Sequence, residues 1–379
     1  MKHRPQRIYL DYAATTPLLP EVRAAMAPWL AGEYGNPSSL YEEGRRARAA
    51  IDEAREVVSG ALGCLFAEVV FTSGGTEAAN LAIVGAALAN EDAARRRILL
   101  GAAEHHCVLH TRPILERLGY RVESIPVDRV ARVRLDELES MLAPDVLLVS
   151  LMSANNELGT IQPVDEVAVL AHRHGALYHC DAVQSLAIQS PKPKTQDRAD
   201  LASYSAHKIG GPKGVGALFV RAGTKVKPLS VGGGQEREMR AGTENVAGIV
   251  GFAAARSAIL DLQSSPARDH FLDLLTAAGF IPTVPNRADA LPRHVHVRLP
   301  GVDAETMLIK LDRMGVSASS GAACSSGSLE PSHVLLACGY LAKEAREGLR
   351  FTFGPSTSVA EAEEAARVVI DCGLELKRV

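Results

Sequence analysis

The sequence predicts an α/β protein with a mainly parallel sheet, because short apolar stretches alternate with longer segments of helical periodicity. The apolar stretches have the length of buried strands, and the segments between them are long enough for crossover helices. We expect strands at residues 69–71, 98–101, 122–126, 146–151, 176–179, 201–204 and 215–220.

A long helix and a second, smaller domain flank this sheet. The amphipathic pattern from Glu42 to Leu62 predicts a helix that ends at Gly63, because glycine readily adopts the left-handed conformation of a helix end. After the turn Gly232–Gly234, a helical run from Thr243 to Leu262 predicts the link to a smaller α+β domain that begins near residue 254.

Composition limits the possible partners and compartment. The chain has 379 residues, enough for two or three domains, and its 41 basic and 44 acidic residues leave no net charge that would favour direct nucleic acid or membrane binding. No apolar run approaches the ~18 residues of a membrane span, and no apolar leader is visible, so we expect a cytoplasmic protein. Six scattered cysteines without a Cys-x-x-Cys pair argue against a disulfide framework or a zinc ribbon.

The stretch 200–218 carries the most distinctive chemistry. An apolar strand leads into Ser205, His207 and Lys208, and a glycine-rich turn follows, in which no helix can continue. A lysine at a strand end among small residues is partly desolvated, which lowers its pKa and makes its amine a nucleophile able to form a Schiff base. The alternative is an ordinary surface lysine in a basic turn.

A phosphate site is predicted where the first strand gives way to a helix at residues 72–78. Free backbone N–H groups and the helix dipole suit a phosphate there, and the Thr76 hydroxyl adds a donor. The alternative is a plain helix cap by Ser73 or Thr76. Neither a Walker loop nor a dinucleotide-binding glycine motif occurs in the sequence.

Two further segments carry reactive side chains. Arg350 lies in a predicted strand, where its guanidinium could bind an amino-acid carboxylate or form a structural ion pair. Cys324 lies in the run 319–331 of small residues without apolar periodicity, which predicts a mobile loop and an accessible thiol. His106 and His110 have helical metal-ligand spacing but lack a third ligand, so we expect no metal.

The segment around Lys208, which reads Ser-x-His-Lys-x-x-Gly-Pro-Lys-Gly, resembles the cofactor-lysine motif of the cysteine desulfurases, pyridoxal-phosphate enzymes of the class V aminotransferase group. The resemblance extends from Tyr9 to Phe351 with matching segments in the same order, and departs at Leu40-Tyr41, where the family often has a histidine. The Cys324 loop is similar to that of the longer-loop branch, which includes the housekeeping and nitrogen-fixation enzymes.

The resemblance implies fold type I of the pyridoxal-phosphate enzymes and a homodimer. A large domain of residues 16–253 would carry a mainly parallel seven-stranded sheet, and residues 1–15 and 254–379 would form the small α+β domain with the cysteine loop. By comparison with the housekeeping members, we expect this chain to lack the longer C-terminal tail by which they dock an iron–sulfur scaffold.

Site residues follow from the resemblance. Lys208 would bind the cofactor and remove the substrate proton, Cys324 would take up sulfur as a persulfide, and His105 would stack on the cofactor ring as an acid/base group. Asp181 would pair with the pyridine nitrogen, which suits a carboxylate at a strand end but is equally the pattern of a helix cap. The expected cofactor contacts are Gly75, Thr76, Asn156, Asp181, Gln184, Ser205, His207, Lys208 and Thr243 of the partner subunit. The expected substrate contacts are Arg350, Asn36 and Asn156.

The implied reaction converts L-cysteine to L-alanine, with sulfur passed from Cys324 to an acceptor protein for iron–sulfur cluster assembly or thiolation. Two alternatives stay open within enzymes: a selenocysteine lyase, and a desulfurase dedicated to one pathway such as DNA or tRNA thiolation. A third is a non-catalytic scaffold of the same fold that only docks partners.

Overall fold

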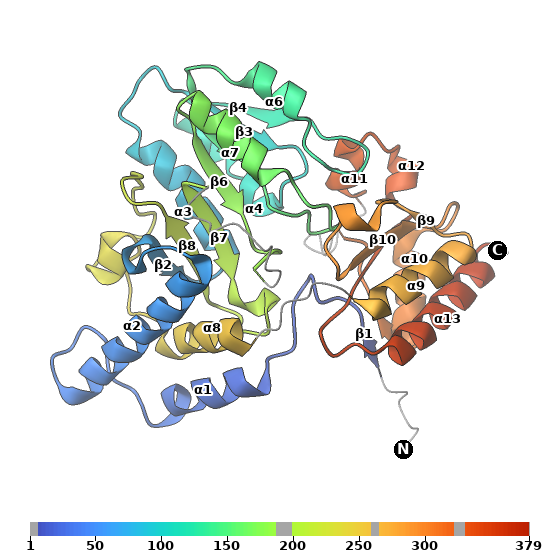
Figure 1. The fold of residues 1–379 in the computed structure, drawn as a ribbon, viewed down its shortest axis with the longest axis horizontal. Helices are drawn as coiled ribbons and strands as arrows, with labels where there is room; N and C mark the ends of the chain where they lie inside the picture. The colour runs from blue at the N-terminus through green and yellow to red at the C-terminus, as the bar shows by residue number, and fades with distance from the viewer. Residues whose placement is uncertain (1–6, 187–198, 259–264, 322–329, 379) are drawn as a thin grey trace.

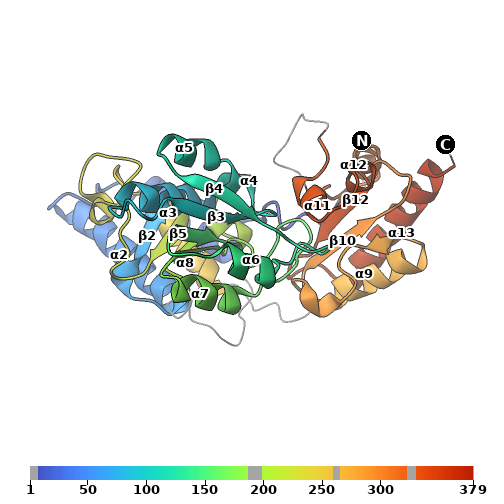
Figure 2. The same cartoon turned by 90° about the horizontal axis from the view of Figure 1, so that it is seen from above.

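The computed structural model describes residues 7–186, 199–258, 265–321 and 330–378. Two bodies lie side by side (Figure 1), one built on a large sheet and the other on the C-terminal part of the chain, and the view from above separates them clearly (Figure 2). Within the described ranges, no helix is long and apolar enough to span a bilayer.

The larger body is organised around a seven-stranded sheet of order β2-β8-β7-β6-β5-β3-β4. β8 runs antiparallel to its neighbours β2 and β7, and the remaining pairs are parallel. Each predicted strand is present to within two residues, which confirms the predicted fold class. The strands are β2 Val69–Thr72, β3 Arg97–Gly101, β4 Arg121–Ile125, β5 Val146–Ser150, β6 Leu177–Asp181, β7 Leu201–Ser205 and β8 Gly216–Val220.

Helices cover both faces of this sheet, so β2, β3, β5, β6, β7 and β8 are buried along nearly their whole length, whereas the edge strand β4 alternates buried and exposed residues. On β2, Val70 faces one core together with α3, whereas Val69 and Phe71 face the other core together with α2, α7 and α8. The helices of this body are α1 Pro20–Ala31, α2 Glu42–Leu62, α3 Gly75–Ala89, α4 His106–Leu109, α5 Arg112–Arg117, α6 Leu135–Met141, α7 Val164–Arg173 and α8 Val246–Ala258.

The smaller body has its own core beneath a three-stranded sheet, in which β10 lies between β9 and β12. The N-terminal strand β1 pairs in parallel with β11, so the start of the chain lies with its end (Figure 1). Its elements are β1 Ile8–Tyr9, α9 Pro266–Ala277, β9 Ile281–Pro282, β10 His294–Arg298, α10 Ala304–Arg313, β11 Val316–Ser317, α11 His333–Ala337, α12 Ala342–Ala345, β12 Gly348–Thr352 and α13 Val359–Leu376.

The long helix α2 has the predicted bounds and ends at Gly63 with a φ of 68°. The helix predicted from residue 243 begins later, at Val246, and is described to Ala258. The domain division at residues 15 and 253 stays a prediction. It is supported by the smaller body's own core, although Ala255 of α8 still packs in the large body and a further apolar cluster joins Leu158 to Val334 across the division.

The loop after β5 approaches the smaller body so closely that it requires glycine at residue 159. Gly159 has a φ of +81°, and a Cβ there would lie 2.4 Å from the Cβ of His294. Gly119 has a similar φ of +83° but has open space around it.

We expect Gly159→Ala to lower the free energy of unfolding by about 3 kcal/mol, because it adds a steric clash to backbone strain. Gly119→Ala should lower it by only about 1 kcal/mol, from strain alone. Urea denaturation of both variants measures the difference. Equal losses would mean that the loop moves away from His294 at no cost.

Candidate active site

Five loops that carry predicted site residues leave the same edge of the large sheet. β2, β3, β5, β6 and β7 point in one direction, because β8 is antiparallel to both β2 and β7 and the other pairs are parallel. The carboxyl ends of such strands form the usual ligand-binding edge of an open α/β sheet. The segments that follow these ends contain Thr76, His105, Asn156 and Lys208, and Asp181 is the last residue of β6.

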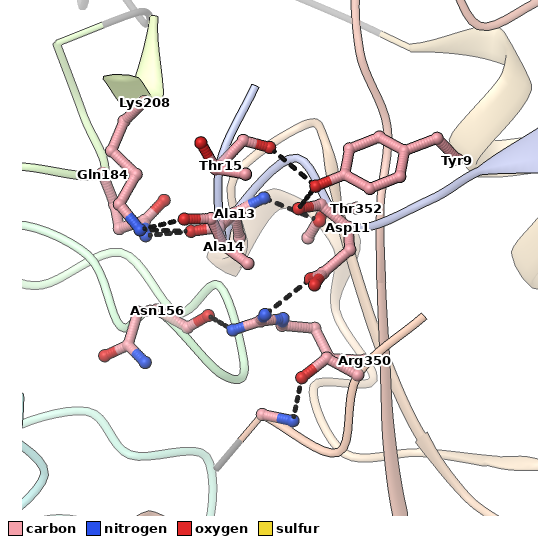
Figure 3. A network of polar contacts seen from close by, with 12 residues as sticks. Tyr9, Asp11, Ala13, Ala14, Thr15, Asn156, Gln184, Lys208, Arg350 and Thr352 are labelled. Atoms are coloured by element: carbon pink, nitrogen blue, oxygen red, sulfur yellow. Dashed lines mark hydrogen bonds and ion pairs between the residues drawn. The ribbon is translucent and has the colours of Figure 1, made fainter. Parts of the chain in front are cut away.

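Lys208 lies in a short helical turn, Ala206–Lys208, directly after β7. Its Nζ donates hydrogen bonds to the carbonyl oxygens of Ala13 at 2.7 Å and Ala14 at 2.8 Å (Figure 3). The Gln184 side chain donates to the same Ala13 oxygen at 3.1 Å. The N-terminal segment therefore brings together two residues that the sequence predicts at the site.

Arg350 approaches this segment from β12 in the smaller body. Its guanidinium donates to the carbonyl oxygen of Asn156 at 2.8 Å and to Asp11 Oδ1 at 2.7 Å (Figure 3). The side chain is 3% exposed, and its Nε has no partner among the described residues. Arg350 is thus held between a loop of the large sheet and the N-terminal segment.

The start of α3 forms a tight, small-residue turn. The N-cap residue of α3 is Gly74, so no side chain caps the start of this helix. A Cβ at Gly75 would lie 2.7 Å from Val183 Cγ2 and 3.5 Å from Ser205 Cβ. Gly75 therefore brings the α3 N-terminus against the ends of β6 and β7, where Ser205 is located.

Burial changes the pKa of the two titratable groups predicted to face the cofactor ring. Asp181 is buried at the end of β6, and desolvation raises its pKa to about 6, although the Val183 N–H and Lys208 oppose the shift. Desolvation, assisted by Lys208, lowers the pKa of His105 to about 4, so its ring is neutral at pH 7. The His105 Nδ1 accepts from the Cys107 N–H at 3.1 Å, which leaves the ring proton on Nε2.

His207 and the asparagines after β5 also have defined environments. The His207 Nδ1 lies 3.1 Å from the Thr15 hydroxyl, in the N-terminal segment again. The Asn155 Oδ1 accepts the Glu157 and Leu158 N–H groups, so Asn155 is a turn residue. By contrast, the Asn156 Oδ1 is buried without a partner among the described residues.

Two predicted site residues, Asn36 and Thr243, are not brought to this edge within one chain. Asn36 is exposed on the loop between α1 and α2 and accepts from the Ser38 N–H at 2.9 Å; Figures 1 and 2 place this loop at the end of the molecule away from β12. Thr243 is exposed before α8. Cys324 lies outside the described residues.

Four residues near the site were not singled out in the sequence. Asp11 binds Arg350, and Arg293 donates to the Gln184 Oε1 at 2.9 Å. Glu104 is fully buried beside His105, and burial together with Asp181 raises its pKa well above the ordinary range. Glu157, also buried, accepts from the Ser332 hydroxyl. A carboxylate within three residues of a strand end was a usable signal for Asp11 and Glu104, which follow β1 and β3, but not for Arg293 or Glu157.

The histidines considered for a metal form an aromatic stack. His106 and His110 lie with parallel rings 4.8 Å apart, and His333 lies 4.4 Å from His106. In the part of the chain that the structure describes, no group of three His, Cys, Asp or Glu side chains is arranged to hold a metal ion.

The arrangement fits a planar, phosphate-bearing aldehyde cofactor. The Gly75 turn supplies backbone N–H groups for the phosphate, Lys208 supplies an amine, and Asp181 supplies a carboxylate for a ring nitrogen. The buried and unpartnered Asn156 Oδ1 provides a hydrogen-bonding position for a ring substituent.

The fold is that of the type I pyridoxal-phosphate enzymes. More specifically, the chain belongs to the aminotransferase class-V family, because the sequence model of that family matches residues 8–364. The cofactor of this family is pyridoxal 5′-phosphate. Among curated relatives, a "Cysteine desulfurase IscS" of Dictyoglomus turgidum is 44% identical over 93% of this chain and 91% of its own length. A "Putative cysteine desulfurase IscS 1" of Bacillus subtilis is 41% identical over 97% of this chain and 98% of its own.

Solved structures agree with these relatives. A "NifS-like protein" superposes with a TM-score of 0.87 at 34% identity, over 97% of this chain and 99% of that chain. A structure described as "SspA in complex with cysteine" superposes with a TM-score of 0.81 at 32% identity, over 92% of this chain and 99% of that one. The predicted family and fold are therefore confirmed.

Glu157 provides a test of the site's electrostatics. Burial raises its pKa from 4.5 to about 7, so the folded protein binds this proton more tightly than the unfolded chain does. Its stabilising contribution is fully present below pH 4.5 and is lost as the pH rises through about 7. We expect the stability of the wild type to fall relative to Glu157→Gln by roughly 2–3 kcal/mol between pH 4.5 and 8.

Urea denaturation across this pH range measures the difference. Substitution of an exposed glutamate on α2, Glu53→Gln, should leave the pH dependence of the wild type unchanged. Parallel curves for the wild type and Glu157→Gln would show that Glu157 has an ordinary pKa.

Proposed function

We propose that the protein is a cysteine desulfurase that converts L-cysteine to L-alanine and transfers the sulfur to an acceptor. The proposal rests chiefly on one juxtaposition: Lys208 and Arg350 contact the same N-terminal segment from opposite sides. An amine and a guanidinium so placed suit an α-amino acid bound over the cofactor. The cysteine desulfurases among the relatives supply the choice of amino acid.

Arg350 binds the substrate carboxylate in this proposal. Its guanidinium is already oriented by the Asn156 carbonyl and by Asp11. The substrate carboxylate therefore competes with the Asp11 carboxylate for the same N–H donors. Burial of the guanidinium strengthens this recognition, because water screens the interaction less.

Lys208 and His105 handle protons. The cofactor, when bound, acts as an electron sink that makes the substrate Cα–H acidic. The Lys208 Nζ removes that proton, and the neutral His105 ring, with its proton on Nε2, is able to donate or accept a second one. The Asp181 carboxylate, oriented by the Val183 N–H at 3.1 Å, stabilises a protonated ring nitrogen.

Cys324 takes up the sulfur. Its thiolate attacks the substrate sulfur, the carbon–sulfur bond breaks, an S–S bond forms, and the carbon accepts a proton to give alanine. The sulfur then remains as a persulfide on Cys324, which transfers it to an acceptor protein such as an iron–sulfur scaffold.

We also propose a homodimer. The loop between α1 and α2 exposes large apolar side chains, with Tyr34 81% and Leu40 89% accessible, and a second copy would cover them. Thr243 and Asn36, both exposed in one chain, could contribute to an active site only across such an interface.

A reducing cytoplasm suits the proposed chemistry, because the reaction needs a free thiol. No disulfide joins the cysteines that the structure describes, which are Cys64, Cys107, Cys180, Cys338 and Cys372.

Arg350→Lys should raise the KM for cysteine by about tenfold to a hundredfold, because an ammonium cannot make the bidentate contact of a guanidinium. Steady-state kinetics of alanine formation measure this effect. Arg298, on the adjacent strand β10, contacts Glu344 and Glu347 instead. Arg298→Lys should therefore leave the KM for cysteine unchanged. An unchanged KM in Arg350→Lys would remove Arg350 from the substrate site.

Cys324→Ser should abolish sulfide release from cysteine while the visible absorbance of the bound cofactor persists, because the serine hydroxyl cannot carry a persulfide. Cys64→Ser, a partly buried thiol in the large body, serves as the matched control and should retain activity.

Selenocysteine turnover by Cys324→Ser separates the remaining alternatives. A dedicated selenocysteine lyase would retain that activity in the variant, which would overturn the assignment as a desulfurase. If the wild-type protein shows no cofactor absorbance, the protein is a non-catalytic scaffold.

A further inference from the structure

The segment 235–244, which precedes α8, is fixed by two arginines of α2. Arg48 and Arg55 lie seven residues apart, close to two helical turns, and therefore point to the same side of the helix. Arg55 pairs with Glu236, and Arg48 pairs with Glu244. Both glutamates are buried, so the segment is anchored near each of its ends.

Glu236 makes the stronger of these anchors. Its carboxylate accepts from Arg55 Nη1 at 2.8 Å, from Arg55 Nη2 at 2.6 Å and from the Phe71 N–H at 2.9 Å. Both side chains of the ion pair are only 2% exposed. Breaking such a pair leaves an uncompensated buried charge, so the contact fixes the backbone of Glu236 firmly.

The backbone at this anchor is strained. Glu236, Arg237 and Glu238 have φ values of 46°, 56° and 65°, in the left-handed region that residues other than glycine avoid. Such a turn persists only where the surroundings fix it. The ion pair with Arg55 supplies that restraint. Arg240 follows the turn two residues later, so the turn influences where Arg240 lies.

Two routes lead from Glu236 to the turn between β2 and α3. One is direct, because the Glu236 carboxylate accepts the N–H of Phe71, a β2 residue that lies two positions before Ser73. The other runs through Arg240, whose Nε donates to Glu77 Oε1 at 2.9 Å, while Glu77 Oε2 accepts the Ser73 N–H at 2.7 Å. Glu77 lies in the first turn of α3, beside Gly75 and Thr76.

We propose that Glu236 is a positioning residue for the cofactor phosphate. Through Phe71 and through the Arg240–Glu77 pair, it holds the Ser73–Thr76 turn in the geometry that presents the Gly75 and Thr76 N–H groups to the phosphate, while the Ser73 N–H is bound by Glu77. This inference rests on the proposed function, because the ligand is the phosphate of pyridoxal 5′-phosphate.

Glu68, at the opposite end of β2, provides a matched comparison. It is also buried and accepts two backbone N–H groups, those of Leu65 and Ala222, each at 2.8 Å. Its contacts are with segments before β2 and after β8, away from the Ser73–Thr76 turn. Glu68 therefore stabilises the same strand without positioning the phosphate turn.

The test compares two ligands that differ only in the phosphate. The apoprotein of each variant is titrated with pyridoxal 5′-phosphate and with pyridoxal, and the ratio of the two dissociation constants is measured by absorbance. Glu236→Gln and Glu77→Gln should weaken binding of the phosphorylated ligand about tenfold and change pyridoxal binding less than twofold. Glu68→Gln should leave the ratio at its wild-type value even if it lowers Tm.

Two results would overturn the inference: a wild-type ratio in a folded Glu236→Gln variant, or an equal change of the ratio in Glu68→Gln. Should Glu236→Gln fail to fold, Glu77→Gln alone decides, because its pair with Arg240 is partly exposed. If the wild type itself binds pyridoxal as tightly as the phosphorylated ligand, the phosphate site is wrong and the proposed function fails first.

Discussion

The N-terminal segment between Asp11 and Thr16 holds the two bodies of the protein together at the active site. On one side its carbonyl oxygens bind the Lys208 amine, and on the other Asp11 binds Arg350. The Ala13 N–H also donates to the Thr352 hydroxyl at 2.8 Å, which fixes the segment to β12. Two cations from different bodies thus bind one short segment, Lys208 at its backbone carbonyl oxygens and Arg350 at the Asp11 side chain, so this segment helps to set their separation.

Local signals in the sequence were sufficient to predict the sheet. Its strands other than the edge strand β4 are buried along nearly their whole length, so most of them are apolar runs bounded by polar or glycine-rich turns. The shared direction of the parallel strands brings the loops that follow them to one edge. The bounds of α2 were predictable for a similar reason, since Gly63 has the left-handed conformation that ends a helix.

The partners of the site residues could not be predicted in the same way. Asp11 and Arg350 are 339 residues apart, and Arg293 reaches Gln184 across 109 residues, so neither pair has a local pattern. The apolar pattern correctly predicted Lys208 at a strand end and Arg350 on a strand. The family resemblance grouped Asn36 with Arg350, which one chain does not bring together. The three consecutive left-handed residues at Glu236 likewise have no signal in a stretch without glycine.

The pairing of β1 with β11 and of Asp11 with β12 has a consequence for biosynthesis. Residues 8–11 meet these partners only after the chain up to β12 has been synthesised, so the large sheet can form before these contacts exist. Completion of the catalytic centre is therefore a late folding event, and a nascent chain interrupted before β12 would contain the lysine without the arginine that accompanies it.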